Sequence, residues 1–243
     1  MHIIKLNAID STNTFLRQLS SEKKVANYTV VVAESQLKGR GQMGTSWDSQ
    51  SGKNLIASVF VDVSFLIIDY SFWISMATSL ALSNALKDFQ IRNVKVKWPN
   101  DILADQKKVS GILIENVIKN NALQATIIGF GLNINQVHFD NLPSATSMLN
   151  VSGAHNNIDN VLVKVIEYLK FYMKLLKNKQ FEDIKKLYET ELFRKEKPST
   201  FEDAEGVLFS GFIKGVSNSG HLQVLIEDDI LKEFDLKEVK LLY

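Results

Sequence analysis

The sequence predicts an α+β protein, built from a mixed or antiparallel sheet with flanking helices and a small C-terminal β-barrel. Four β-type segments follow one another closely over residues 94–134, which favours an antiparallel meander. Two helical segments come next without intervening strands. From about Glu202 the chain changes to short strands separated by turns, which is typical of a small barrel. We therefore divide the chain into domains at 1–197 and 198–243.

The first elements frame a long irregular segment. A short strand is predicted around residues 2–6, and the run Asp-Ser-Thr-Asn at residues 10–13 is typical of a cap that opens a helix over 14–20. Residues 28–34 are rich in β-branched side chains and predict a buried strand. Residues 35–53 are rich in Gly, Ser and Gln without any hydrophobic period. Loops of this length usually carry function or are disordered.

The remaining elements follow from apolar patterning. Alternation over residues 55–61 predicts a strand, and a helix is predicted with Ser71 as its cap. The expected elements from this helix onward are a helix over 71–89, strands at 94–98, 101–104, 108–118 and 123–134, and helices over 158–177 and 181–192.

Composition excludes several classes of function. Lys and Arg number 28 against 27 Asp and Glu, so no overall positive field is available to hold nucleic acid. The absence of cysteine excludes disulfides, Cys-zinc sites and thiol nucleophiles, and it fits a reducing, cytoplasmic compartment. The N-terminus lacks a secretory pattern, and the most apolar helical run, residues 72–82, is shorter than the roughly 20 residues that span a bilayer. We expect no membrane partner.

The most informative segment is Lys-Trp-Pro-Asn-Asp at residues 97–101, followed by a lysine- and glycine-containing strand over residues 107–115. Alternation along a strand sends Lys107 and Lys108 to opposite faces, so one of them points inward and needs an anionic partner. The alternative is that Lys108 is a solvated strand residue. A rigid proline beside an amide and a carboxylate favours a site at the start of this strand.

A glycine-rich motif lies upstream, where Gly39, Gly41 and Gly44 match the dinucleotide-binding pattern G-x-G-x-x-G and Asp62 lies near the spacing of a ribose-binding acid. That motif must open a helix, however, and residues 45–53 show no apolar period. The sequence therefore does not predict a dinucleotide fold. The loop still suits an anion, because glycine lets backbone N–H groups converge and Arg40 adds a bidentate cation. A mobile surface loop is the alternative.

Three further features have two interpretations each. Trp47 and Trp98 are either apolar anchors or planar stacking surfaces. The triplet Ser-Thr-Asn at residues 11–13 is either a helix cap or a ligand-binding group, and the two roles are compatible because a helix N-terminus presents free N–H groups. Together with the glycine-rich loop, these features suggest activation of a carboxylate by a nucleotide.

Four ordered motifs resemble those of biotin protein ligases, and the resemblance covers nearly the whole chain. They are Gly-Arg-Gly-Gln-Met-Gly at residues 39–44 with Trp47, Lys-Trp-Pro-Asn-Asp at 97–101, Lys-Val-Ser-Gly-Ile-Leu-Ile-Glu at 108–115, and Gly-Phe-Gly-Leu-Asn-Ile-Asn at 129–135. The resemblance implies a catalytic domain like that of class II aminoacyl-tRNA synthetases, binding biotin and ATP, with an SH3-like barrel behind it. The helix-turn-helix domain of repressor members is expected to be missing.

The implied reaction has two steps: biotin and ATP give biotinyl-5′-AMP and pyrophosphate, and a lysine of a biotin carboxyl carrier protein domain then takes the biotin. Mg²⁺ would screen the triphosphate, with no metal ligands assigned. The oligomeric state stays open, a homodimer included. The residues implied on the biotin side are Ser11, Thr12, Asn13, Gln36, Arg40, Gly41, Gln42, Lys108 and Gly111.

Catalysis would rest on Lys108, with Arg40 and Asp101, because negative charge builds where the biotin carboxylate attacks the α-phosphate. The nucleotide side would include Trp47, Asn100 and Asn133. Many members have a second arginine where this chain has Gln42, and a neutral amide holds an acyl phosphate less tightly than a guanidinium. This departure bears on retention of the intermediate.

Two alternatives compete with this interpretation. A lipoate or octanoate ligase shares the fold, but the sequence has no Gly-Gly-Gly-type loop with a nearby histidine. A non-catalytic biotin or nucleotide sensor, or a repressor, is the other. Near-neutral charge weighs against the repressor, and the presence of both Arg40 and Lys108 weighs against an inactive enzyme.

Overall fold

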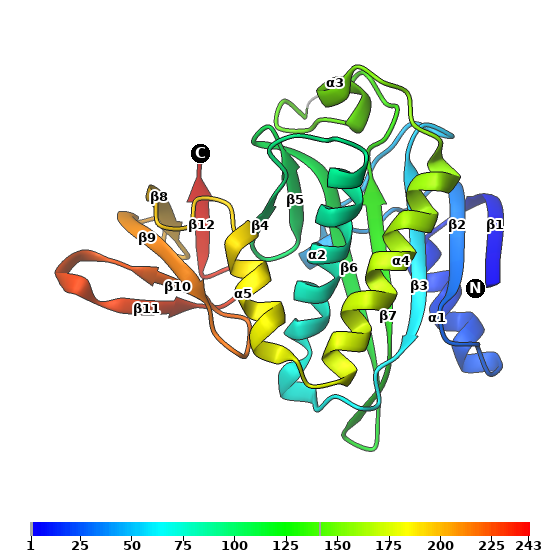
Figure 1. The fold of residues 1–243 in the computed structure, drawn as a ribbon, viewed down its shortest axis with the longest axis horizontal. Coiled ribbons are helices and arrows are strands. Elements are labelled where there is room, and N and C mark those ends of the chain that lie inside the picture. The colour runs from blue at the N-terminus through cyan, green and yellow to red at the C-terminus, as the bar shows by residue number, and fades with distance from the viewer. Residues whose placement is uncertain (1, 141) are drawn as a thin grey trace.

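A mixed seven-stranded sheet forms the centre of the protein (Figure 1). The computed structural model describes residues 2–140 and 142–243. The strand order is β1-β2-β3-β7-β6-β5-β4, in which β1 and β2 are parallel and every other neighbouring pair is antiparallel. The predicted meander is confirmed. The strands are β1 (His2–Ile9), β2 (Thr29–Gln36), β3 (Leu55–Asp62), β4 (Lys95–Lys97), β5 (Asp101–Ala104), β6 (Lys107–Lys119) and β7 (Ala122–Leu132).

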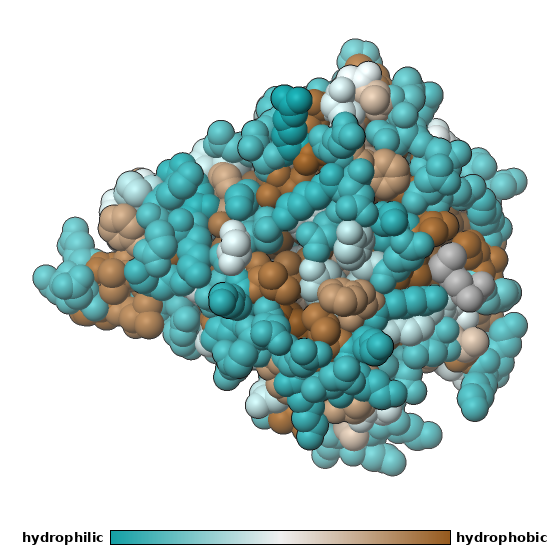
Figure 2. Space-filling model, viewed as in Figure 1, coloured by the Kyte–Doolittle hydropathy of each residue, from teal (hydrophilic) through white to brown (hydrophobic). Residues whose placement is uncertain are grey.

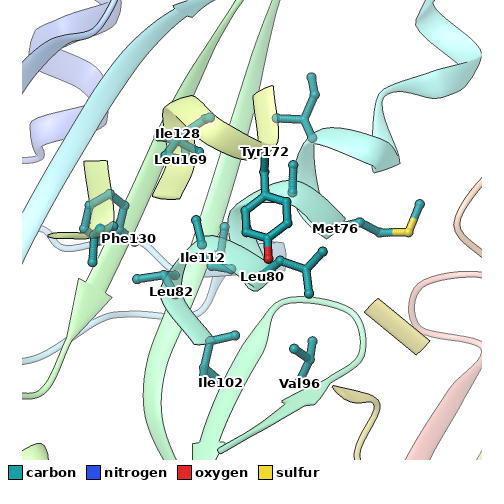
Figure 3. Close-up of a cluster of buried hydrophobic side chains, with 14 of the residues drawn as sticks. Met76, Leu80, Leu82, Val96, Ile102, Ile112, Ile128, Phe130, Leu169 and Tyr172 are labelled. Carbon is teal, nitrogen blue, oxygen red and sulfur yellow. The ribbon is translucent and has the colours of Figure 1, made fainter. Parts of the chain in front are cut away.

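Helices cover both faces of this sheet. On one face, α2 (Phe72–Asp88) and α4 (Ile158–Lys177) lie side by side, with α5 (Phe181–Glu191) beyond them (Figure 1). Their apolar residues pack with alternate residues of the central strands, including Leu80, Leu169, Ile128 and Phe130 (Figure 3). On the opposite face, Leu16 of α1 (Thr12–Glu22) packs on Val31 and Ile127. The mixed α+β class predicted from the sequence is confirmed.

Helix caps agree only in part with the sequence. Ser11 caps α1 as expected, since its hydroxyl accepts from the backbone N–H of Thr14 at 3.5 Å. Ser71 occupies the cap position of α2, but its backbone is helical and its side chain makes no capping hydrogen bond, so its predicted capping role is wrong. The short helix α3 (Met148–Ser152) was not predicted, because five residues give no hydrophobic period.

A second sheet follows in the C-terminal segment. Its strands are β8 (Pro198–Asp203), β9 (Leu208–Val216), β10 (Leu222–Leu225), β11 (Leu231–Phe234) and β12 (Val239–Leu242). Their order is β11-β10-β9-β8-β12, and the outer strands β11 and β12 are not paired with each other. The expected small β-domain is present as an open five-stranded sheet, so closure into a barrel is not confirmed. Turn spacing predicts short strands, but it does not determine whether the outermost two meet.

The small sheet is fixed to the main one through Trp98. The indole Nε1 donates to the carbonyl of Gly220 at 2.8 Å. Gly220 lies against the ring of Phe72 with φ 97°, and a Cβ there would overlap the ring. Trp98 therefore joins the two sheets. On the face shown in Figure 2, hydrophilic side chains predominate and apolar ones are interspersed. The helices of the described residues are too short or too polar to cross a membrane.

Candidate active site

A cavity of about 340 Å³ gathers every predicted site residue except Asn133. Its floor is the part of the sheet where Gly111 and Leu113 of β6 pair directly with Gly131 and Gly129 of β7. Because side chains alternate along a strand, these glycines leave the sheet surface open on one face while their neighbours enter the core on the other. The other predicted residues that line the cavity are Ser11, Thr12, Asn13, Gln36, Arg40, Gly41, Gln42, Trp47, Asn100, Asp101 and Lys108.

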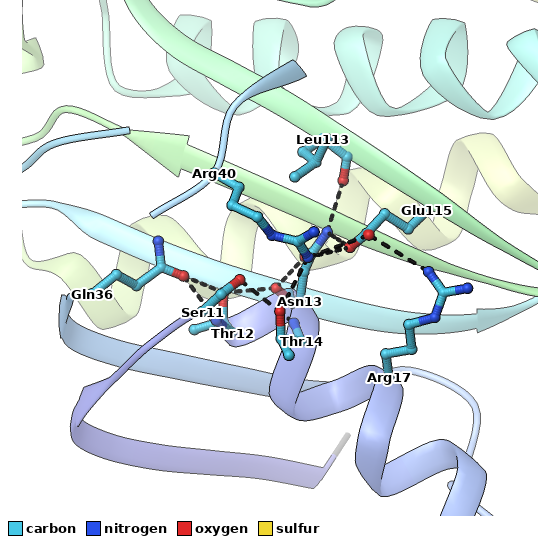
Figure 4. Close-up of polar contacts among 10 residues, drawn as sticks. Ser11, Thr12, Asn13, Thr14, Arg17, Gln36, Arg40, Leu113 and Glu115 are labelled. Atoms are coloured by element: carbon cyan, nitrogen blue, oxygen red, sulfur yellow. Dashed lines mark hydrogen bonds and ion pairs between the residues drawn. The ribbon is translucent and has the colours of Figure 1, made fainter. Parts of the chain in front are cut away.

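One end of the cavity is a chain of polar side chains (Figure 4). Gln36 Oε1 accepts from the backbone N–H of Thr12 at 2.8 Å and lies 3.0 Å from its hydroxyl. Asn13 Nδ2 donates to Glu115 Oε2 at 2.8 Å, while Ser58 Oγ lies 2.6 Å from Asn13 Oδ1 and 2.7 Å from Thr12 Oγ1. Helix α1 thus enters the site with its first side chains already ordered.

The sequence did not single out Ser58, which is fully buried in β3. Its strand is otherwise strongly apolar, and the one local signal is a serine among buried aliphatic residues. Gly129 has a related role, because a Cβ at this position would overlap Asn13 Oδ1. The polar end therefore depends on a hydroxyl and a glycine from central strands.

The other end of the cavity holds an ion pair. Lys108 Nζ lies 2.7 Å from Asp101 Oδ1, and these side chains are 37% and 18% exposed. Lys107 is exposed, so the prediction that one lysine of the pair points inward to an anion is confirmed. Asp101 Oδ1 is buried and makes no well-aligned hydrogen bond among the described residues, so its contact with Lys108 is mainly electrostatic. Asn100 supports the turn beside it by donating to the carbonyl of Ile112 at 2.8 Å.

Cations surround this end of the cavity. Burial lowers the pKa of Lys97. The nearby charge of Asp101 raises this pKa, while the positive charges of Lys108 and Lys240 lower it further. Lys237 reaches the cavity wall with Leu236 from the segment between β11 and β12, and Val239 reaches it from the start of β12. The contribution of the small sheet was missed, because nothing local in that segment indicates a contact with a site more than one hundred residues earlier in the chain.

The glycine-rich segment forms a narrow hairpin instead of an unstructured loop. Trp47 N–H donates to the carbonyl of Gly39 at 3.0 Å, and Gly41 N–H donates to that of Thr45 at 2.6 Å. A single 3₁₀ turn, Gln42–Gly44, closes it with Met43 at φ 61°. The next element is β3, so the exclusion of a dinucleotide fold is confirmed.

The hairpin places two predicted side chains. The Trp47 indole lies where a Cβ on Gly131 would overlap it, and Lys108 Nζ is 5.6 Å from its ring centre. The Arg40 guanidinium donates to Thr14 Oγ1 at 3.1 Å and to Glu115 at 3.1 and 3.2 Å. Trp47 thus lies over the floor near the ion pair, and Arg40 lies at the polar end.

We expect residues 36–47 to exchange their backbone amide hydrogens rapidly in the free protein and slowly with biotin and ATP bound. Residues 43–46 are exposed, and few apolar contacts offset the entropy of ordering them. Hydrogen exchange with mass spectrometry measures this, with peptides from α4 as an internal reference. Equal exchange in this segment with and without ligands would contradict closure of the loop.

Asn133 lies outside the cavity. It is 4% exposed, and its side-chain amide donates to the carbonyl of Thr146 at 3.0 Å, while its backbone N–H donates to that of Val109 at 2.9 Å. In this structure Asn133 ties the segment before α3 to the sheet. Its nucleotide-binding role stays a prediction.

A model of the biotin/lipoate A/B protein ligase family matches residues 6–133, just over half of the 243 residues. The chain belongs to this family. It is 31% identical over 157 residues to the bifunctional ligase/repressor BirA of Bacillus spizizenii, a match over 63% of this chain and 47% of that protein. It is also 31% identical over 163 residues to the biotin-[acetyl-CoA-carboxylase] ligase of Mycobacterium tuberculosis, a match over 65% of this chain and 59% of that protein. The chain thus spans about half the length of these curated relatives.

Solved members of the family have the same fold. The biotin protein ligase from Aquifex aeolicus in complex with biotin and ATP superposes with a TM-score of 0.83 and 28% identity, covering 99% of this chain and 98% of that one. The Leishmania major enzyme in complex with biotinyl-5-AMP has a TM-score of 0.62 at 21% identity, a likeness of fold. The resemblance to biotin protein ligases seen in the sequence is confirmed.

Proposed function

We propose that this chain is an ATP-dependent biotin protein ligase, which forms biotinyl-5′-AMP and transfers biotin to a lysine of a biotin carboxyl carrier protein domain. The observation that carries the proposal is one cavity with two chemically different ends, an ordered chain of neutral polar groups at Thr12 and Gln36 and the Lys108–Asp101 ion pair. The ligase names of the relatives support it.

The polar end suits a urea-like ring, which offers two N–H donors and one carbonyl acceptor. Gln36 Nε2 makes no hydrogen bond to the described residues, and the Ser11 hydroxyl accepts from Thr14 but donates to none of them. Both groups therefore retain a donor for a ligand carbonyl.

Activation would take place at the ion pair. A carboxylate oxygen of biotin attacks the α-phosphorus of ATP, a new O–P bond forms, and pyrophosphate leaves with the electrons of the broken bond. Lys108 neutralises the negative charge that gathers on the α-phosphate oxygens, so its effect is strongest in the transition state. Asp101, at 2.7 Å, holds the ammonium group in place.

Transfer would then use the same end of the cavity. The neutral ε-amine of the carrier lysine attacks the acyl carbon of the mixed anhydride, the nitrogen releases a proton to solvent, and AMP leaves with the electrons of the broken C–O bond. Asp101 is the carboxylate among the residues that line the cavity, and it would orient the incoming amine.

Mg²⁺ fits this arrangement as a companion of ATP. The described residues contain no group of three His, Cys, Asp or Glu side chains that could cage a metal. Mg²⁺ in nucleotide sites is usually held by phosphates, waters and one or two carboxylates, where it screens phosphate charge. Asp101, the carboxylate among the residues that line the cavity, is the residue that would contact it.

The direct test is to incubate the protein with biotin, ATP, Mg²⁺ and a biotin carrier domain and to measure the mass of the carrier. A mass increase of one biotin that requires ATP and the carrier's acceptor lysine is expected. Lipoate and octanoate replace biotin in parallel reactions. Transfer of either acid in preference to biotin would assign the chain to the lipoate branch, and ATP-independent binding without transfer would make it a sensor.

Gln42→Arg should slow release of biotinyl-5′-AMP about fivefold, because an arginine-phosphate contact exceeds a neutral hydrogen bond by about 1 kcal/mol. Gln42 lines the cavity, and its side chain makes no hydrogen bond to the described residues. The wild type should accordingly leak intermediate, seen as hydrolysed adenylate or biotin on non-carrier lysines. Dissociation is measured by dilution into excess unlabelled biotin, with exposed Gln124→Arg as the charge-matched control. An unchanged rate in Gln42→Arg would show that other contacts hold the loop.

A further inference from the structure

We propose that Glu115 is a positioning residue, which sets the direction of the hydrogen bonds at the polar end of the cavity. This inference rests on the proposed function. Glu115 ends the motif at residues 108–115, yet neither the sequence nor the proposed chemistry gives it a role. It does not line the cavity, and its side chain is 16% exposed. It therefore acts through its neighbours.

The carboxylate of Glu115 joins groups from separate elements (Figure 4). Asn13 Nδ2 donates to it at 2.8 Å, Arg40 Nη2 lies 3.1 Å from Oε2, and Arg17 Nη1 lies 3.6 Å from Oε1. A largely buried carboxylate needs such partners to offset its lost hydration. Glu115 thus ties the first turn of α1 and the glycine-rich hairpin to β6.

The direction of the hydrogen bonds follows from the chemistry of a carboxylate, which only accepts when ionised. Asn13 must therefore turn its NH₂ group to Glu115, and this amide also donates to the carbonyl of Leu113 at 3.3 Å. Its oxygen Oδ1 is left facing Ser58, and the Ser58 hydroxyl donates its one hydrogen bond to this oxygen at 2.6 Å. Glu115, together with the Leu113 carbonyl, thereby determines which way both groups point.

Thr12 is next in the chain. Because the Ser58 hydroxyl donates its hydrogen bond to Asn13, the Thr12 hydroxyl must donate a hydrogen bond to Ser58 Oγ at 2.7 Å or to Gln36 Oε1 at 3.0 Å. Either choice leaves Thr12 able only to accept from a ligand. A ring N–H of biotin needs such an acceptor, while its carbonyl needs the donors of Ser11 and Gln36. Glu115 therefore presents Thr12 in the state that complements a urea.

Two substitutions separate this role from simple packing. Glu115→Gln keeps the length of the side chain but introduces an NH₂ donor, which lets Asn13 reverse and Thr12 present its proton to the ligand. Glu115→Asp is shorter but still only accepts. A positioning role predicts that Glu115→Gln is the more damaging change, with biotin affinity lowered about tenfold. A space-filling role predicts that Glu115→Asp is the more damaging change. One misdirected hydrogen bond at about 1.4 kcal/mol corresponds to this factor.

The experiment measures biotin binding by calorimetry without ATP, together with the KM for ATP and the thermal unfolding midpoint of each variant. We expect weaker biotin binding in Glu115→Gln, smaller losses in Glu115→Asp, and an unchanged KM for ATP. Arg17→Ala is the matched control, because this arginine also faces Glu115 but is 57% exposed and lies outside the cavity. In a Thr12→Val background, Glu115→Gln should have less effect.

The outcomes are distinct. If the wild type does not bind biotin, the proposed function itself fails. If the wild type binds biotin and Glu115→Gln binds equally well, or if Asp is worse than Gln, Glu115 has no positioning role. A fall in the unfolding midpoint of Glu115→Gln that accounts for its loss of biotin binding would also overturn the proposal. The unfolding midpoint and biotin affinity of Glu115→Asp supply an independent comparison.

Discussion

Lys108→Ala is expected to lower the rate of biotinyl-5′-AMP formation by about ten- to a hundredfold while leaving the protein folded. A charge-assisted contact to a desolvated anion is worth roughly 1.5–3 kcal/mol, and a difference of this size in the transition state gives such a change in rate. Lys108 is 37% exposed, so its removal leaves no large cavity, although Asp101 loses its cation.

Pyrophosphate release in the absence of carrier measures this step directly. Lys107→Ala is the control, because the neighbouring lysine carries the same charge on the same strand but is exposed. Lys107→Ala should retain normal rates of both steps. If Lys108→Ala forms adenylate normally and fails only in transfer to the carrier, Lys108 acts on the amine and the proposed activation step is wrong.

Local patterning was sufficient to place Lys108 and to expect its anionic partner, because the alternation of a strand is a property of the nearest residues. It also gave the cap at Ser11 and the order of the meander, which depend on neighbouring segments. These features required no knowledge of distant parts of the chain. The sites they define were therefore predictable from sequence.

Contacts between distant segments were not predictable in this way. Ser58 reaches Asn13 from another element, and Lys237 enters the cavity wall from the small sheet. Neither has a local signal, since the side chain acquires its role from what the fold brings opposite it. Open or closed pairing of β11 with β12 likewise depends on the curvature of the whole sheet. Sequence motifs name the residues of this site more readily than the scaffold that orients them.

The two glycines of β7 on the cavity floor offer the sharpest separation of the two substrates. Gly129 and Gly131 face the same side of β7, and a Cβ on Gly129 would overlap Asn13, whereas one on Gly131 would overlap the Trp47 indole. Forcing an extra methyl group into packed surroundings costs about 1–3 kcal/mol, or about fivefold to 150-fold in affinity. Gly129→Ala should therefore weaken biotin binding, and Gly131→Ala should raise the KM for ATP.

Each variant is the control for the other, because the same methyl group is added two residues apart on one strand. Calorimetry gives the affinity for biotin, and steady-state pyrophosphate release gives the KM for ATP. Gly111→Ala adds a milder comparison, since its Cβ would come no closer than 3.1 Å to the flexible side chains of Trp47 and Lys108. If both variants weakened biotin and ATP equally, the two ends of the cavity would not be independent. An unchanged KM for ATP in Gly131→Ala would remove Trp47 from the nucleotide side.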